Sequence, residues 1–248
     1  MKAMILAAGL GTRLRPLTDT RPKALVEVAG RTLLEITLTR LSSFGVRDFI
    51  INVHHFPDMI LDYLKAHNNF GLHIEISREE HLLDTGGGLK KASWFFLNDS
   101  LHWGEPFILH NVDVLSSIDL RRMVQFHEEK QAFATLAVQR RESSRLLLFD
   151  EGLSLCGRQT DRKAEPMRPS AELHSQALAF CGIHVISPLF LGTMRERGAF
   201  SIIDSYLGLA AQGEDIIGFC ADEYYWRDLG RPEDLKEAEK DLNQNGSL

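Results

Sequence analysis

The first 140 residues alternate between short apolar runs typical of buried strands and longer segments whose apolar residues recur at the helical spacing. The predicted strands are Met4–Ala8, Phe49–Val53, His73–Ser77, Phe107–Leu109 and Ala134–Gln139, and the predicted helices are Thr32–Phe44, Pro57–His67, Leu89–Phe96 and Ile118–Lys130. This alternation favours an α/β fold, in which helices cover both faces of a parallel sheet. Ligands of such sheets bind outside the carboxyl ends of the strands. Polar clusters fall there after Ala8, at Asp84–Gly88 and after Leu109, so we expect a site at that edge.

The pattern changes after about residue 140. The predicted elements are then strands Leu146–Phe149, Leu178–Ile186 and Tyr224–Leu229 and helices Pro188–Arg195, Ile202–Gln212 and Pro232–Asn243. The polar segment 158–174 contains Pro166 and Pro169 and predicts a mobile loop. Because there is no internal repeat or low-complexity linker, residues 1–248 are expected to form one domain with halves at 1–140 and 141–248.

Composition excludes several classes of protein. A hydrophobic content of 44% in 248 residues is enough for a sizeable core, and a net charge of -6 offers no footprint for nucleic acid or an anionic membrane. No apolar run approaches the ~18 residues of a membrane span. The three cysteines include no C-x-x-C pair, which argues against a disulfide framework or structural zinc. We therefore expect a cytoplasmic protein with no nucleic-acid or membrane partner.

The strongest motif follows the first predicted strand. Residues 6–18 read L-A-A-G-L-G-T-R-L-R-P-L-T, and R-P-K follows at residues 21–23. The segment supplies two glycines and three cations for a polyphosphate: Gly9, Gly11, Arg13, Arg15 and Lys23. It is not a Walker loop, and the third glycine of a dinucleotide fingerprint is replaced by Leu14.

Three further clusters carry candidate chemistry. Asp113 follows the strand Phe107–Leu109, and Asp228 lies in W-R-D-L-G-R-P; a carboxylate at a strand end suits Mg²⁺. Asp113 could instead cap a helix or be solvated, and Asp228 could pair with a neighbouring arginine. The glycines of Asp84–Gly88 leave room for a flat group close to the backbone, or form a flexible loop before the helix at Leu89.

At these motifs the chain resembles the sugar-1-phosphate nucleotidylyltransferases, which join a nucleoside triphosphate to a sugar 1-phosphate. The resemblance runs from Lys2 to about Leu242, and the T-G-G-G form is most similar to the N-acetylmuramate-1-phosphate uridylyltransferases of cell-wall recycling and to short mannose-1-phosphate guanylyltransferases. It implies a Rossmann-like, mostly parallel but mixed sheet between helices, the glycosyltransferase-A-like nucleotidyltransferase fold. Residues 1–140 would bind the nucleotide and residues 141–248 the sugar. Val112 departs from the family's Asn-Gly-Asp, and Arg231 stands where threonine is usual.

The resemblance also implies a role for each candidate residue. Nucleotide contacts are expected at Leu6, Ala8, Gly9, Gly11, Thr12, Arg13, Glu79, Asp84, Thr85 and Gly86. Sugar-phosphate contacts are expected at Asn111, Gly182 and His184. Asp113 and Asp228 would hold Mg²⁺, Arg13 would hold the leaving phosphates and Lys23 would bridge the reacting ones. By the same resemblance His54 and His55 would help to shape the sugar side of the site; the alternative is a packed or solvated pair.

Two other functions stay open. A Rossmann oxidoreductase needs a ribose-binding acid about 20 residues after the glycines, and Glu27 and Glu35 lie near that distance. A non-catalytic regulatory relative would be expected to lose Arg13, Lys23 or the two acids, and all are present. UTP is favoured over GTP by resemblance alone, and the protein is expected to be a monomer or a homodimer.

Overall fold

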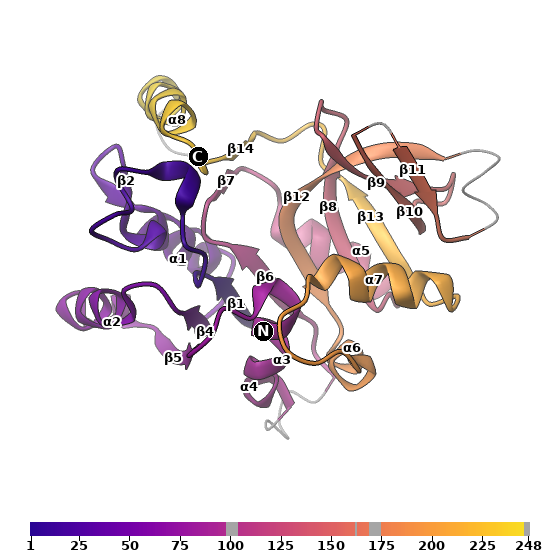
Figure 1. Ribbon diagram of the computed structural model, residues 1–248, viewed down its shortest axis with the longest axis horizontal. Helices are drawn as coiled ribbons and strands as arrows, with labels where there is room; N and C mark the ends of the chain where they lie inside the picture. The colour runs from indigo at the N-terminus through magenta and orange to yellow at the C-terminus, as the bar shows by residue number, and fades with distance from the viewer. Residues whose placement is uncertain (98–103, 162, 169–174, 246–248) are drawn as a thin grey trace.

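A ten-stranded mixed sheet lies at the centre of the computed structural model, which describes residues 1–97, 104–161, 163–168 and 175–245 (Figure 1). Four neighbouring strands are parallel, in the order β6 (Phe107–Asn111), β1 (Lys2–Leu6), β4 (Asp48–Val53) and β5 (His73–Arg78). They coincide with predicted strands, and their carboxyl ends lie together because Leu6 pairs with Asn52 on one side and Asn111 on the other.

The second half of the chain adds antiparallel strands through the long strand β12 (Gln176–Ile186). Strand β12 pairs with β6, with β8 (Ala134–Gln139) and with β9 (Arg145–Phe149). Strand β9 continues into β10 (Leu155–Thr160) and β11 (Lys163–Pro166), while β13 (Ile216–Cys220) runs parallel to β8. The sheet is therefore mixed with a parallel centre, as predicted.

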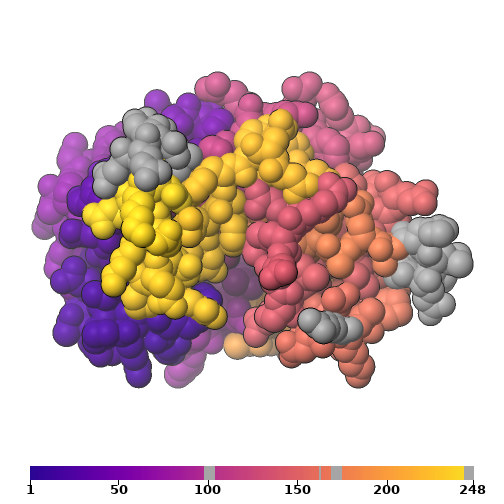
Figure 2. All heavy atoms as spheres, turned by 90° about the horizontal axis from the view of Figure 1, so that it is seen from above, coloured from indigo at the N-terminus to yellow at the C-terminus, as the bar shows by residue number. Residues whose placement is uncertain are grey.

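Two short ribbons lie outside this sheet. One joins β2 (Glu27–Val28) to β3 (Arg31–Thr32), and the other joins β7 (Val114–Ser116) to β14 (Trp226–Asp228). The β7–β14 ribbon brings a segment near the carboxyl terminus beside the end of β6. In Figure 2 the C-terminal segment, in yellow, extends across the surface from the indigo N-terminal part toward the red and orange part.

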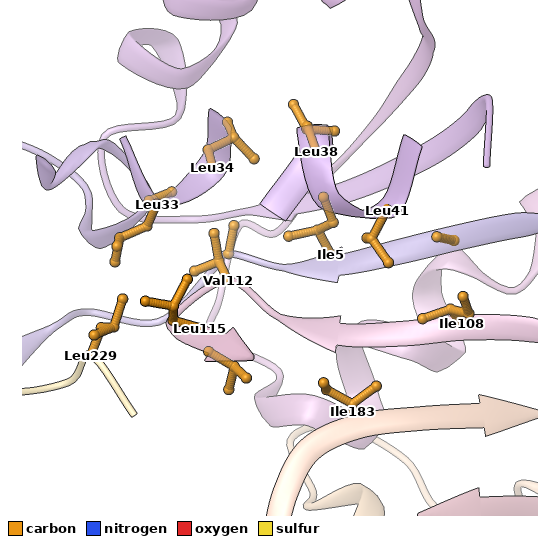
Figure 3. Packing of buried hydrophobic residues seen from close by; sticks show 14 of the residues in the cluster. Ile5, Leu33, Leu34, Leu38, Leu41, Ile108, Val112, Leu115, Ile183 and Leu229 are labelled. Atoms are coloured by element: carbon orange, nitrogen blue, oxygen red, sulfur yellow. The ribbon is translucent and has the colours of Figure 1, made fainter. Parts of the chain in front are cut away.

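Helices cover both faces of the sheet, as predicted. One core holds side chains of α1 (Leu33–Ser43), α2 (Pro57–Ala66), α5 (Leu120–Lys130) and α8 (Pro232–Asn245), and the other holds those of α3 (Asp84–Ala92), α4 (Trp94–Leu97), α6 (Pro188–Thr193) and α7 (Ile202–Ala211). Strand β1 serves both cores, because Ile5 points into the first and Met4 into the second. Figure 3 shows Ile5 in the first core below Leu34 and Leu38 of α1.

Local signals explain where several helices begin. The Thr32 hydroxyl accepts a hydrogen bond from the Glu35 amide at 3.1 Å, so Thr32 caps the first turn of α1. Proline occupies the first position of α2 and α6, where a missing amide hydrogen costs nothing. Among the described residues, no helix is both long and apolar enough to cross a membrane.

The structure corrects three predictions. Helix α3 begins at Asp84 and ends at Ala92, so the run of glycines is helical rather than a loop before Leu89. The predicted mobile loop at 158–174 is wrong for its first part, since residues 158–160 and 163–166 are paired strands of β10 and β11. Residues 162 and 169–174 lie outside the described part. Strand β13 was not predicted, because its pairing with β8 depends on contacts distant in sequence.

Candidate active site

The cation-bearing loop that leaves β1 is held by tight packing at Gly11. Gly11 has a φ of 64°, and a Cβ there would lie 2.8 Å from Thr18 Cγ2 and 3.1 Å from Lys23 Cβ. The Thr18 hydroxyl donates to the Gly11 carbonyl at 2.8 Å, and fully buried Leu14 anchors the 3-10 helix η1 (Thr12–Leu14). Only glycine therefore lets this loop close on Lys23.

The same loop contradicts the oxidoreductase alternative. The dinucleotide fingerprint needs an α-helix directly after its glycines, so that the helix amides face the pyrophosphate. Here the glycines lead into one 3-10 turn, after which Arg15 is extended with a ψ of 142°. The first α-helix starts only at Leu33.

Asn52 fixes the end of β1 and was not among the predicted site residues. Its Oδ1 accepts a hydrogen bond from the Ala7 amide at 2.8 Å, and its Nδ2 donates to Glu79 Oε1 at 2.7 Å. The Leu83 amide donates to Glu79 Oε2 at 2.9 Å, so both oxygens of this buried carboxylate have protein partners. The sequence signal that could have identified Asn52 is a polar residue near the end of the otherwise apolar strand Phe49–Val53.

The two candidate metal acids are brought together by the β7–β14 ribbon. Asp228 pairs in register with Val114, the residue after Asp113, and the Leu229 amide donates to the Asp113 carbonyl at 2.7 Å. The side chains are 15% exposed at Asp113 and 40% exposed at Asp228. Both carboxylates thus lie at the carboxyl edge of the parallel strands, as expected from the sequence.

Each acid is paired with a cation of the β1 loop. Lys23 Nζ forms an ion pair with Asp113 Oδ2, and Arg13 Nη2 lies 3.8 Å from Asp228 Oδ2. The structure therefore joins all four residues expected to handle phosphate and metal. The alternative pairing of Asp228 with Arg227 or Arg231 is not what the structure shows, since Arg227 pairs with Asp241 at 2.8 Å.

Gly230 makes the approach of Arg13 to Asp228 possible and was not among the predicted site residues. A Cβ at Gly230 would lie 2.5 Å from Arg13 Nη2 and 2.5 Å from Asp228 Oδ1. The Gly230 amide also donates to Asp228 Oδ1 at 2.6 Å. The position of Gly230 in W-R-D-L-G-R-P, two residues after Asp228, was a signal in the sequence, but only the folded structure shows which side chains it contacts.

Val112 fits at the position where the family resemblance implies glycine. Its φ is not left-handed, so the backbone requires no glycine. The side chain is 3% exposed and packs in the first core, with its amide donating to the Leu6 carbonyl at 3.2 Å (Figure 3). The substitution therefore leaves Asp113 in place.

The glycines of α3 have a packing reason. A Cβ at Gly86 would lie 2.4 Å from the Phe200 ring, and a Cβ at Gly87 would lie 2.5 Å from the Gly198 carbonyl oxygen. The flat group that comes close to this backbone is thus a side chain of the protein itself. Thr85 Oγ1 accepts a hydrogen bond from the Ile202 amide at 3.0 Å, which ties α3 to α7.

Of the three expected sugar-phosphate residues, two lie together and one lies elsewhere. Gly182 has a φ of 72°, and a Cβ there would lie 2.8 Å from Asn111 Nδ2. His184 is 1% exposed, and its Nδ1 lies 2.9 Å from the Tyr206 hydroxyl in the second core. Burial lowers the pKa of His184 to about 3. We conclude that His184 stabilises the core, and we do not place it on the substrate.

The paired histidines contact different partners. His54 Nδ1 lies 2.9 Å from the Glu79 carbonyl oxygen, and His55 Nε2 lies 3.4 Å from the Thr18 carbonyl oxygen.

No group of three or more metal-binding side chains occurs among the described residues. Two carboxylates are nevertheless the donors that suit Mg²⁺, which keeps several waters and completes its shell with substrate phosphates. Asp113 and Asp228 thus fit that ion.

Comparison with known proteins identifies the family. A family model described as nucleotidyl transferase matches residues 2–146. The chain belongs to the nucleotidyl transferase family, as the motifs predicted.

Individual relatives are similar over nearly the whole chain. The N-acetylmuramate alpha-1-phosphate uridylyltransferase of Caulobacter vibrioides is 34% identical over 97% of this chain and 96% of that protein. The mannose-1-phosphate guanyltransferase of Yarrowia lipolytica is 30% identical over 95% of this chain, which spans 62% of that protein's length. A solved UDP-glucose pyrophosphorylase complexed with UDP-glucose aligns over 98% of both chains, with a TM-score of 0.79 and 19% identity. HddC of Yersinia pseudotuberculosis complexed with GMP-PN aligns over 97% of this chain and 99% of its own, with a TM-score of 0.77 and 20% identity. These structures confirm the predicted fold class.

Proposed function

We propose that this protein transfers a nucleotidyl group from a nucleoside triphosphate to a sugar 1-phosphate and releases pyrophosphate. The observation that carries the proposal is the pair of cation–carboxylate contacts, Lys23 with Asp113 and Arg13 with Asp228, at the carboxyl edge of the parallel strands. This is where open α/β sheets bind ligands. Family membership supports the same class of reaction.

The chemistry needs positioning and charge rather than a general base. A phosphate oxygen of the sugar 1-phosphate, already an anion, attacks the α-phosphorus of the nucleotide in line. The bond from the α-phosphorus to the bridging oxygen breaks, and pyrophosphate leaves with that electron pair. No proton must be removed, so catalysis consists of alignment and charge neutralisation.

The residues of the site would divide this work. Arg13 is 55% exposed at its side chain and would contact the leaving phosphates from its place beside Asp228, whereas Lys23 is 12% exposed and would contact the reacting α-phosphate. Asp113 and Asp228 would hold Mg²⁺, which when bound supplies positive charge against the α-phosphate. The backbone at Gly9 leaves room for a ligand, since a Cβ there would meet nothing within 4 Å. The amides of Gly9 and Gly11 would face the triphosphate.

We propose UTP as the nucleotide, with GTP second, and an N-acetylated amino-sugar or hexose 1-phosphate as the acceptor. The full-length similarity to the Caulobacter uridylyltransferase supports UTP, and the mannose-1-phosphate guanyltransferases support GTP. The nucleobase would lie beside Asp84 and Thr85 at the start of α3, with Glu79 bracing the strand ends behind it.

A matrix of nucleoside triphosphates against sugar 1-phosphates, read by pyrophosphate release with Mg²⁺, tests the proposal. We expect one preferred pair, with UTP among the active nucleotides. Absence of pyrophosphate release from every pair, with folded protein, would refute it.

A further inference from the structure

The strand that carries Asp228 belongs to a ribbon outside the main sheet. Within the described residues β14 pairs only with β7, in a register that sets Asp228 opposite Val114. A ribbon of two strands is marginally stable by itself, so contacts on its faces must hold it. Side chains alternate between the faces of an extended segment. Trp226 and Asp228 therefore share one face, and Tyr225 and Arg227 share the other.

The face that carries Asp228 is only lightly held. Trp226 Nε1 donates a hydrogen bond to the Cys181 carbonyl at 2.7 Å. Arg13 Nη2 lies 3.8 Å from Asp228 Oδ2, which is long for a hydrogen bond, and both side chains are well exposed. The contact with Arg13 therefore fixes the Asp228 carboxylate only weakly.

The opposite face of β14 is held by one carboxylate of the C-terminal helix. Asp241 Oδ2 accepts hydrogen bonds from the Tyr225 hydroxyl at 2.6 Å and from Arg227 Nη2 at 2.8 Å and Nε at 3.2 Å. Arg227 Nε also donates to the Tyr225 hydroxyl oxygen at 3.0 Å, which closes the network. The side chains of Arg227 and Asp241 are only 28% and 25% exposed, so salt and water weaken this pair less than a surface pair.

Helix α8 gives this carboxylate a firm base. Leu235 and Ala238 are buried in the first core, and Leu242 packs against the same core. Their spacing places them on one face of the helix. Because Asp241 lies between Ala238 and Leu242 in the sequence, apolar packing on both sides fixes its position independently of the ribbon.

Glu237 on the same helix shows a different arrangement. Its carboxylate pairs with Lys240 at 2.7 Å, and the two side chains are 52% and 65% exposed. Both partners belong to α8, so this pair joins no second element of the fold. Asp241, by contrast, ties α8 to two residues that flank Trp226 on the ribbon.

We propose that Asp241 is a positioning residue of the site. By holding Tyr225 and Arg227 it fixes the back of β14, and the front of the strand then keeps the Asp228 carboxylate beside Asp113. Removal of Asp241 would weaken the binding of a divalent cation, although Asp241 lies on the other face of the strand. This inference rests on the proposed function, which places Mg²⁺ at Asp113 and Asp228.

The experiment compares Asp241→Ala with the wild-type protein in two measurements on the full chain without substrates. Residue-resolved hydrogen–deuterium exchange follows the amides of Ser117 and Leu229, which donate to the carbonyls of Tyr225 and Asp113 across the ribbon. These two amides should exchange faster in the variant, and those of the parallel strands should not. Titration with Mn²⁺ alone, read by electron paramagnetic resonance, should show about 10-fold weaker binding, the lower end of the range for residues that orient metal ligands.

Glu237→Ala is the matched control, because it removes the same charge from the same helix. It should keep the wild-type Mn²⁺ affinity, whereas an effect of charge at long range would weaken Mn²⁺ binding in both variants. Asp241→Asn keeps a side-chain oxygen that can accept from Tyr225, so it should retain part of the affinity. It also carries the comparison if Asp241→Ala does not fold.

Four results would overturn the proposal: wild-type Mn²⁺ affinity in the Asp241 variants, an equal loss in Glu237→Ala, faster exchange throughout the sheet, or a wild-type protein that binds no Mn²⁺. If the Asp241 variants lose Mn²⁺ affinity while no pair of substrates releases pyrophosphate, the proposed function fails and the assignment of Asp241 stands. If pyrophosphate is released and Asp241→Ala binds Mn²⁺ like the wild type, only the assignment of Asp241 fails.

Discussion

Gly230→Ala is expected to damage catalysis without damaging the fold. The added Cβ would lie 2.5 Å from Arg13 Nη2 and from Asp228 Oδ1, whereas ordinary contact begins at 3.4 Å. The Arg13 guanidinium and the Asp228 carboxylate must therefore each retreat by about 0.9 Å. The Arg13 side chain is 55% exposed and flexible, so its move costs little folding free energy. Misplacing a positioning group by about 1 Å can cost about 10²-fold in rate, and we expect that loss in kcat/KM.

The assay measures pyrophosphate release at saturating Mg²⁺ together with the melting temperature. Gly208→Ala in α7 is the control, because a Cβ there meets nothing within 4 Å; activity should stay at the wild-type level. Because alanine favours a helix over glycine by about 1 kcal/mol, the control should melt no lower than the wild type.

A double-mutant cycle with Arg13→Ala identifies the cause. If Gly230→Ala acts by displacing Arg13, the double variant should lose much less than the product of the two single losses. Wild-type activity in Gly230→Ala, or fully multiplicative losses, would refute the reasoning. A large fall in melting temperature would show instead that Gly230 supports the fold.

Three further predictions concern acid stability, metal binding and packing. Burial lowers the pKa of three histidines, to about 4 for His110 and His127 and about 3 for His184. The unfolded chain takes up protons on these histidines near pH 6.5, and the folded chain does not. The contribution of the neutral histidines to the free energy of unfolding is therefore complete above that pH and falls toward pH 4. Three protons at about 1.36 kcal/mol each give a limiting slope of ~4 kcal/mol per pH unit. Urea unfolding between pH 4.5 and 7.5 measures the slope, and a flat profile would contradict it. Lys23→Ala should lower kcat by about 10²–10³-fold. The same variant should bind Mn²⁺ more tightly in the absence of nucleotide, because Lys23 no longer competes for Asp113. Electron paramagnetic resonance titration should show the higher Mn²⁺ affinity, and an unchanged affinity would argue against competition. Gly86→Ala should destabilise the α3–α7 contact by about 1–3 kcal/mol through overlap with Phe200, and an unchanged unfolding midpoint would show that the ring moves freely.

Features with local causes could be predicted from the sequence. Three of the four parallel strands, β1, β4 and β6, could be predicted because each is a short apolar run, and α1 begins where Thr32 caps it. The loop after β1 could be predicted because its glycines, prolines and cations lie within eighteen residues. Such features are determined by neighbours along the chain, so periodicity and side-chain type suffice to find them.

Other features depend on contacts between residues distant in sequence. The approach of Asp228 to Asp113 requires the β7–β14 ribbon, and that of Arg13 to Asp228 requires Gly230. The glycines of α3 suggested a loop because the residue that requires them, Phe200, lies far away in the sequence. The order of residues is enough to say which chemical groups this protein carries and at which strand ends they lie. Which of these groups meet depends on the folded structure, because their contacts form when separate segments pack into one core.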